Sequence, residues 1–381
     1  MYLDYQATTP ADLRVVDAMQ PYWTQEFGNP HSEGHSYGWK ARRAVEYARS
    51  QAADFIDADD DEIVFTSGAT ESCNIALRGI ASAVPPNARR QIITLATEHS
   101  AVLETARWLG LHGYDAEVLP VKPDGLLDLR ELESALSHRT LLVSVMLANN
   151  EIGVIQPLAE ISRLCRAAGA LVHTDATQAA GRININVDDL GVDLLSLSGH
   201  KIYGPNGVGV LYVRNRPDLR IKPTVTGGSQ ERGIRPGTVP VPLAVGMGKA
   251  CAIASEQTED DAEHLSKLGK RLLRELKTDF PDLRIFGHPD QRIPGNLCLG
   301  FPGIPGELLV ESVSDEVAIS TGAACATGSP EPSHVLMALG VDSETAATGV
   351  RISLGRFTTE DEISAASESL RRALKVHTRR G

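Results

Sequence analysis

The chain has 381 residues, which is more than one hydrophobic core usually supports, so we expect two domains. Hydrophobic residues make up 42% and charged residues 23%, a balance typical of a folded globular protein. The formal net charge of −12 argues against direct nucleic-acid binding, and the longest apolar run, at 141–148, is far too short to span a membrane.

Short apolar runs of strand type alternate with helical patterns through the first two-thirds of the chain. Strands are predicted at 62–66, 91–95, 140–147, 170–174, 192–197 and 207–213. A helix is predicted at 37–56 from apolar residues at helical spacing, and another between Pro157 and Gly169, which suit helix ends. Such alternation indicates an α/β fold with a largely parallel sheet that is covered on both faces.

The pattern changes after about residue 250. A long charged helix is predicted at 259–277, and short strands are predicted at 296–299, 317–320 and 350–353. A final helix begins at Thr359, where Glu362 is placed to complete a capping box. These elements predict a second, smaller α+β domain.

The five cysteines are scattered and form no C-x-x-C pair, which disfavours disulfides or a metal site and is typical of a reducing cytoplasm. Four of them are interpreted as small buried hydrophobes: Cys73, Cys165, Cys251 and Cys298. Cys325 differs, because it lies among Gly, Ser, Thr and Pro without an apolar face. We expect a mobile loop at about 321–333 that carries Cys325 as a nucleophile.

The most specific segment is at 196–209, where Lys201 follows an apolar strand among small residues. A lone lysine is usually a surface residue. A lysine held out of water, however, can act as a base or condense with a carbonyl group. The glycines of this segment precede a strand and not a helix, so a dinucleotide-binding loop is disfavoured.

Asp175 and Gln178 follow the predicted strand at 170–174, at the sheet edge where ligands of α/β proteins collect. Asp175 is interpreted either as a turn cap or as the counter-ion of a protonated pyridine nitrogen. The nearby pair His173 and Asp175 could also ligate a metal, but no third ligand motif accompanies it.

The segment 66–72 reads as a strand, small hydroxyl residues and then a helix, which is typical of a phosphate site. Any helix start looks similar, so this pattern alone is weak. Ser198 and His200 are placed to reach the same phosphate. Arg351, near the end of another predicted strand, is either a surface charge or a carboxylate ligand.

Together these segments resemble a group I cysteine desulfurase of the NifS/IscS type, in the class V aminotransferase family. The resemblance covers nearly the whole chain and is carried by 3–10, 66–74, 97–99, 149–153, 175–178, 198–209, 227–233, 320–330 and 351–358. It implies the pyridoxal-phosphate-dependent transferase fold of type I. In that fold, a large cofactor-binding domain at 16–255 would contain a mainly parallel seven-stranded sheet, and 1–15 with 256–381 would form the small domain.

The resemblance also implies roles for individual residues. Catalysis would depend on Cys325, Lys201 and His99, the last stacking on the cofactor ring. Pyridoxal 5′-phosphate would be bound by Lys201, Asp175, Gln178, Ala69, Thr70, Ser198, His200 and, from the partner subunit of a homodimer, Thr238. The substrate carboxylate would be bound by Asn150 and Arg351.

The activity so implied is removal of sulfur from L-cysteine, giving L-alanine and a persulfide on Cys325 that passes to a protein acceptor in the cytoplasm. Iron–sulfur assembly, tRNA thiolation and DNA phosphorothioation are alternative destinations. Alternative functions are a selenocysteine lyase, a cysteine sulfinate desulfinase, or a non-catalytic sulfur-carrier docking protein. No metal, membrane or direct nucleic-acid contact is expected.

Overall fold

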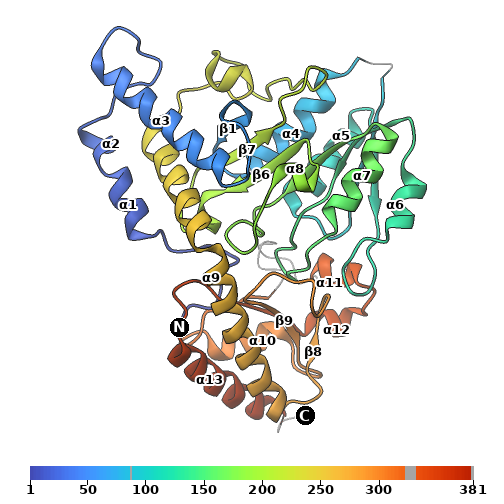
Figure 1. Ribbon diagram of the computed structural model, residues 1–381. Helices are drawn as coiled ribbons and strands as arrows, with labels where there is room; N and C mark the ends of the chain where they lie inside the picture. Colours follow the sequence, from blue (N-terminus) through green and yellow to red (C-terminus); the bar gives the residue numbers. More distant parts are fainter. Residues whose placement is uncertain (86–87, 322–331, 379–381) are drawn as a thin grey trace.

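The computed structural model describes residues 1–85, 88–321 and 332–378. A large region is built around one sheet, and the long helix α9 (Val241–Asp279) leads from it to a smaller region that also contains the first residues of the chain and the last described ones (Figure 1). Tyr2, Leu3 and Asp4 therefore pack with the last elements of the chain, and the residues that directly follow them contact the large region.

The large sheet has the strand order β1-β7-β6-β5-β4-β2-β3. Its strands are β1 (Ile63–Thr66), β2 (Gln91–Leu95), β3 (Asp115–Leu119), β4 (Thr140–Ser144), β5 (Leu171–Asp175), β6 (Leu194–Ser198) and β7 (Gly209–Val213). The neighbours from β6 to β3 are parallel, whereas β7 runs antiparallel to both β6 and β1. The predicted mainly parallel seven-stranded sheet is confirmed.

Helices cover both faces of this sheet. They are α1 (Leu13–Met19), α2 (Pro21–Thr24), α3 (Ser36–Asp54), α4 (Ala69–Ala83), α5 (Ser100–Leu111), α6 (Leu129–Ala135), α7 (Leu158–Ala168) and α8 (Val187–Leu190), with short 3-10 turns η1 (Asp60–Glu62), η2 (Gly199–Lys201) and η3 (Gln230–Gly233). Alternate strand residues face opposite layers. Val143 packs in the core with α3, α7 and α9, whereas Leu142 packs in the core with α4 and α5.

The local predictions hold where the sequence pattern is strong. Helix α7 is flanked by Pro157 and by Gly169, whose left-handed φ of 71° suits glycine at a helix end. Strand β3 was missed because it lies at the sheet edge and is largely exposed, so its charged residues hide the apolar alternation. The predicted strand at 140–147 is too long, since β4 ends at Ser144.

The smaller region contains an antiparallel sheet of order β10-β9-β8. Its elements are β8 (Arg284–Ile285), β9 (Asn296–Gly300), α10 (Gly306–Val313), α11 (His334–Ala338), α12 (Ser343–Ala347), β10 (Gly349–Ser353) and α13 (Glu360–Thr378). Thr359 and Glu362 form the predicted capping box at the start of α13. The predicted strand at 317–320 forms only isolated bridges, one of them to Tyr2.

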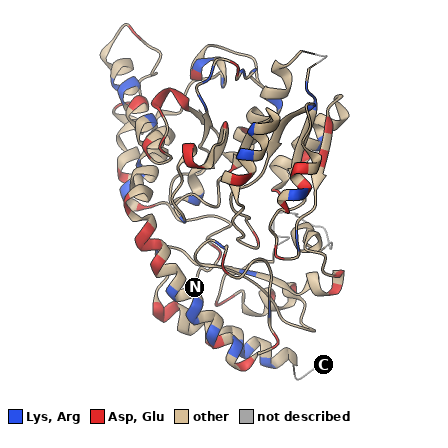
Figure 2. Cartoon of the chain, turned by 45° about the vertical axis from the view of Figure 1, so that its right-hand side comes forward, with Lys and Arg blue, Asp and Glu red and all other residues tan. Residues whose placement is uncertain are grey.

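Helix α9 (Val241–Asp279) is one continuous helix of 39 residues and includes the predicted helix at 259–277. Acidic residues gather in its middle and Lys and Arg nearer its C-terminal end (Figure 2). The proposed domain boundary at 255/256 falls inside this helix and stays a prediction. Leu3 shares a separate hydrophobic core with residues from 265 to 374. Among the described residues, no helix is long and apolar enough to cross a membrane.

Candidate active site

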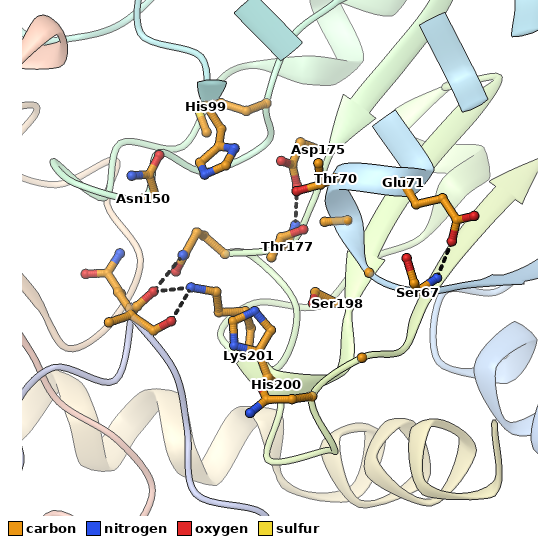
Figure 3. A pocket seen from close by; sticks show the side chains of 18 of the residues that line it. Ser67, Thr70, Glu71, His99, Asn150, Asp175, Thr177, Ser198, His200 and Lys201 are labelled. Atoms are coloured by element: carbon orange, nitrogen blue, oxygen red, sulfur yellow. Dashed lines mark hydrogen bonds between the residues drawn. The ribbon is translucent and has the colours of Figure 1, made fainter. Parts of the chain in front are cut away.

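A cavity of about 450 Å³ opens at the carboxyl ends of the central strands, the edge where α/β sheets bind ligands. It is lined by Gln6, Ala7, Ser67, Gly68, Ala69, Thr70, Glu71, His99, Met146, Asn150, Asp175, Thr177, Gln178, Ser198, His200, Lys201, Asn206, Gly207 and Arg351. The side chains of His99, Asn150, Asp175 and Lys201 surround one space (Figure 3). Loops after β1, β2, β4, β5 and β6 all contribute to it.

Lys201 belongs to the 3-10 turn η2, which begins directly after β6. Its amine donates hydrogen bonds to the backbone carbonyl oxygens of Gln6 and Ala7, the latter at 2.8 Å (Figure 3). The N-terminal segment therefore forms the wall on which the lysine amine rests.

Asp175 is the last residue of β5 and is only 6% exposed. Its Oδ1 accepts a hydrogen bond of 2.9 Å from the Thr177 amide, which fixes the carboxylate at the cavity. Burial raises the pKa of the neighbouring Glu98 well above its usual value and lowers the pKa of His173 to about 4. The His173 ring is therefore uncharged near neutral pH.

The first turn of α4 lies at one end of the cavity. Its N-cap residue, Gly68, has φ of 147°, and no side chain caps the helix. The amides of this turn and the positive end of the helix dipole thus face a space bordered by Thr70, Ser198 and His200. Burial lowers the pKa of His200 to about 4, helped by the Lys201 charge, so the ring is neutral near pH 7.

Asn150 and Arg351 meet where the smaller region contacts the large sheet. Arg351 Nη1 donates to the Asn150 carbonyl oxygen at 2.8 Å, and Nη2 donates to Asp4 Oδ1 at 2.8 Å. Its Nε is buried and has no hydrogen-bond partner among the described residues. The arginine is therefore oriented by two groups, Asn150 and Asp4.

His99 caps α5, because its Nδ1 accepts a hydrogen bond of 3.1 Å from the Ala101 amide. This bond requires Nδ1 to lack a proton, so a neutral ring carries its proton on Nε2. The capping bond also fixes the ring at the cavity wall, beside Asn150 and above Lys201 as drawn in Figure 3.

The structure brings together ten of the twelve predicted site residues. The cavity is lined by Ala69, Thr70, His99, Asn150, Asp175, Gln178, Ser198, His200, Lys201 and Arg351. Thr238 is exposed and does not line this cavity, and Cys325 lies outside the described residues. Cys73, Cys165, Cys251 and Cys298 are buried and unpaired, as predicted. Within the described ranges, no three His, Cys, Asp or Glu side chains are grouped to hold a metal.

Sequence reasoning missed the N-terminal wall of the cavity. Gln6 and Ala7 lie within the segment 3–10 that carried part of the family resemblance, but neither was given a role. Their contacts with Lys201 span almost two hundred positions of the chain, and no local pattern predicts such a contact.

Comparisons with known proteins give the family of this chain. Residues 1–365 match the family "Aminotransferase class-V". The cysteine desulfurase IscS of Rickettsia typhi is 50% identical over 366 residues, which cover 96% of this chain and 89% of that protein. A NifS-like protein of known structure is 37% identical with a TM-score of 0.92, and 99% of each chain is covered.

A further similar structure is "SspA in complex with cysteine", which is 34% identical with a TM-score of 0.82 and covers 94% of this chain and 99% of that one. The chain therefore belongs to the class-V aminotransferase family. Within that family it is a cysteine desulfurase of the NifS and IscS type.

Proposed function

We propose that this cysteine desulfurase holds pyridoxal 5′-phosphate at Lys201, takes L-cysteine as its substrate and collects the sulfur as a persulfide on Cys325. One observation carries the proposal: an amine, a buried carboxylate and an uncapped helix start surround a single cavity. The bound cysteine in the related SspA structure supports L-cysteine as the substrate.

The residues present fit this cofactor. Its phosphate would be held by the first turn of α4 with Thr70, Ser198 and His200, as the missing side-chain cap allows. Asp175 would pair with the ring nitrogen and Gln178 with the ring hydroxyl, while Lys201 would bind the aldehyde carbon. When bound, the pyridinium ring supplies an electron sink for negative charge at the substrate α-carbon.

The side chains of the protein would bind the substrate, transfer the protons and accept the sulfur. Arg351 and Asn150 would bind the substrate carboxylate, and the Lys201 amine would take the α-proton and return a proton to the product. The Cys325 thiolate would attack the substrate sulfur, so that a sulfur–sulfur bond forms while the carbon–sulfur bond breaks. The product is L-alanine, and the sulfur remains on Cys325 for a protein acceptor.

We also infer a homodimer in which Thr238 serves the cavity of the partner subunit. Its exposure outside its own cavity supports this role. Large aromatic side chains near α2 and α3 are exposed in the single chain, as expected of a surface that a second copy covers. They are Trp23, Phe27, Tyr37, Trp39 and Tyr47.

The unpaired buried cysteines support a reducing compartment, the cytoplasm. The acceptor is a protein of iron–sulfur assembly, tRNA thiolation or DNA phosphorothioation. A selenocysteine lyase or sulfinate desulfinase would need no attacking thiol, so replacing Cys325 with Ser separates the alternatives. We expect the variant to lose cysteine turnover, whereas retained turnover would exclude the persulfide step.

Borohydride reduction of the purified yellow protein tests the cofactor assignment. The colour should bleach and the cofactor mass should appear on the peptide that contains Lys201. The Lys201→Ala variant should carry no such label. A colourless wild-type protein, or a label on another lysine, would contradict the proposal.

A further inference from the structure

Gln6 is fixed on one wall of the cavity through its backbone. It is 2% exposed, its amide donates to Ser353 Oγ at 3.0 Å, and its carbonyl oxygen accepts hydrogen bonds from Lys201 and Gln178. The neighbouring bridge between Asp4 and Ser353 holds the same segment beside β10. The direction of the Gln6 side chain is therefore set by the fold.

A chain of hydrogen bonds also fixes which end of the Gln6 amide faces which neighbour. Arg292 Nη1 donates to Asn296 Oδ1 at 3.0 Å, and Asn296 Nδ2 donates to the Glu151 carbonyl oxygen at 2.9 Å. Arginine only donates and a carbonyl oxygen only accepts, so Asn296 cannot be turned around. Its Nδ2 also donates to Gln6 Oε1 at 2.6 Å. Gln6 must therefore present its oxygen to Asn296.

The other end of the amide, Nε2, is buried and has no hydrogen-bond partner among the described residues, although Gln6 lines the cavity. A buried donor without a partner costs about 1–3 kcal/mol, so native proteins rarely leave one unsatisfied. At a binding cavity, the natural partner is an acceptor atom of the ligand.

Charge on the same wall identifies the kind of acceptor. Asp4, two positions before Gln6, holds Arg351 by a 2.8 Å ion pair, and Arg351 Nε is a second buried donor without a partner in the described chain. Gln6 and Arg351 both line the cavity, and a guanidinium together with an amide N–H favours an anion with two oxygen atoms.

We propose that Gln6 is a further substrate-binding residue, whose Nε2 donates a hydrogen bond to the α-carboxylate of the amino acid held by Arg351. This inference rests on the proposed function and adds a residue that determines specificity for amino acids over simple amines. Gln6 thus joins Asn150 and Arg351 at the carboxylate.

Two variants separate ligand binding from a purely structural role. Gln6→Glu keeps an oxygen for Asn296 Nδ2 but replaces the free donor with a carboxylate oxygen, which repels the ligand carboxylate. Gln6→Met has a similar length and removes both polar atoms. Gln291→Met makes the same change at an exposed position and serves as the control.

The test compares two ligands that differ only in the carboxylate, S-methyl-L-cysteine and 2-(methylthio)ethylamine, by calorimetric titration of the cofactor-loaded protein. Wild type and Gln291→Met should prefer the amino acid to the same degree. We expect Gln6→Met to lower this preference about tenfold, the value of one hydrogen bond to a charged group, and Gln6→Glu to lower it further. Melting temperatures and cofactor absorbance show that each variant is folded and loaded.

An unchanged preference in folded Gln6→Glu protein would overturn the proposal, as would equal weakening of both ligands in both variants, since these results indicate a structural role alone. Wild-type protein that holds the cofactor but binds neither ligand would contradict the proposed function itself, and the role of Gln6 with it.

Discussion

Ser333 Oγ donates a hydrogen bond of 2.6 Å to Glu151 Oε2, and both residues are buried. Glu151 directly follows Asn150 in the loop after β4, whereas Ser333 caps the start of α11. The bond thus ties a residue next to the proposed substrate site to the smaller region. Burial raises the pKa of Glu151 to about 7.

The raised pKa of Glu151 predicts a stability that depends on pH. Between pH 4.5 and about 7, Glu151 keeps a proton in the folded protein that it releases in the unfolded chain. The resulting contribution of Glu151 to the free energy of unfolding is present below pH 4.5 and is lost as the pH rises through 7. The loss amounts to about 3 kcal/mol. Glu151→Gln keeps an acceptor for Ser333 but does not titrate. The melting temperature of wild type relative to this variant should fall between pH 5 and pH 8, and a constant difference would contradict the prediction.

His173 should give the opposite dependence. Its ring bonds Ser144 Oγ at 2.8 Å and Ser196 Oγ at 2.9 Å, and burial lowers its pKa from 6.5 to about 4. As the pH falls, His173 therefore binds a proton in the unfolded chain before it does so in the folded protein. Its contribution to the free energy of unfolding is present above pH 6.5 and is lost as the pH falls through 4. Relative to His173→Gln, the wild-type protein should lose stability on acidification from pH 7 to pH 4. A difference in melting temperature between the two proteins that stays constant from pH 7 to pH 4 would exclude the effect.

Asp175→Asn tests the proposed counter-ion. The change keeps the shape and the bond from the Thr177 amide but removes the charge that faces the cavity. We expect the variant to retain the cofactor, because its phosphate contacts are intact, and to form alanine from cysteine at least about a hundredfold more slowly. Asp188→Asn, at an exposed position, is the control. Near-normal turnover with Asn at position 175 would refute the assignment.

Asp4→Asn tests whether Arg351 needs its ion pair. Only 3% of the Arg351 side chain is exposed. Loss of the Asp4 charge therefore leaves the buried guanidinium charge without its counter-ion and weakens the contact that orients it. We expect KM for cysteine to rise about tenfold while kcat changes less, because binding and not chemistry is affected. Steady-state kinetics separate the two parameters. A fall in kcat with an unchanged KM would argue against this role of Asp4.

The sequence predicted those parts of the site that follow strands. Asp175 and Lys201 lie just after apolar runs, and the carboxyl ends of parallel strands meet at one edge. The N-terminal wall could not be predicted in this way, because the contact from Lys201 to Gln6 joins residues 195 positions apart. The same applies to Glu151 and Ser333, whose pairing depends on how the two regions pack.

The mass of the Cys325 peptide, recorded after incubation of the purified protein with L-cysteine, tests the proposed chemistry most directly. The peptide should gain one sulfur atom that a thiol reductant removes, and the Lys201→Ala variant should show no gain. Alanine formation by wild-type protein whose Cys325 peptide stays unmodified throughout turnover would contradict sulfur transfer through this cysteine.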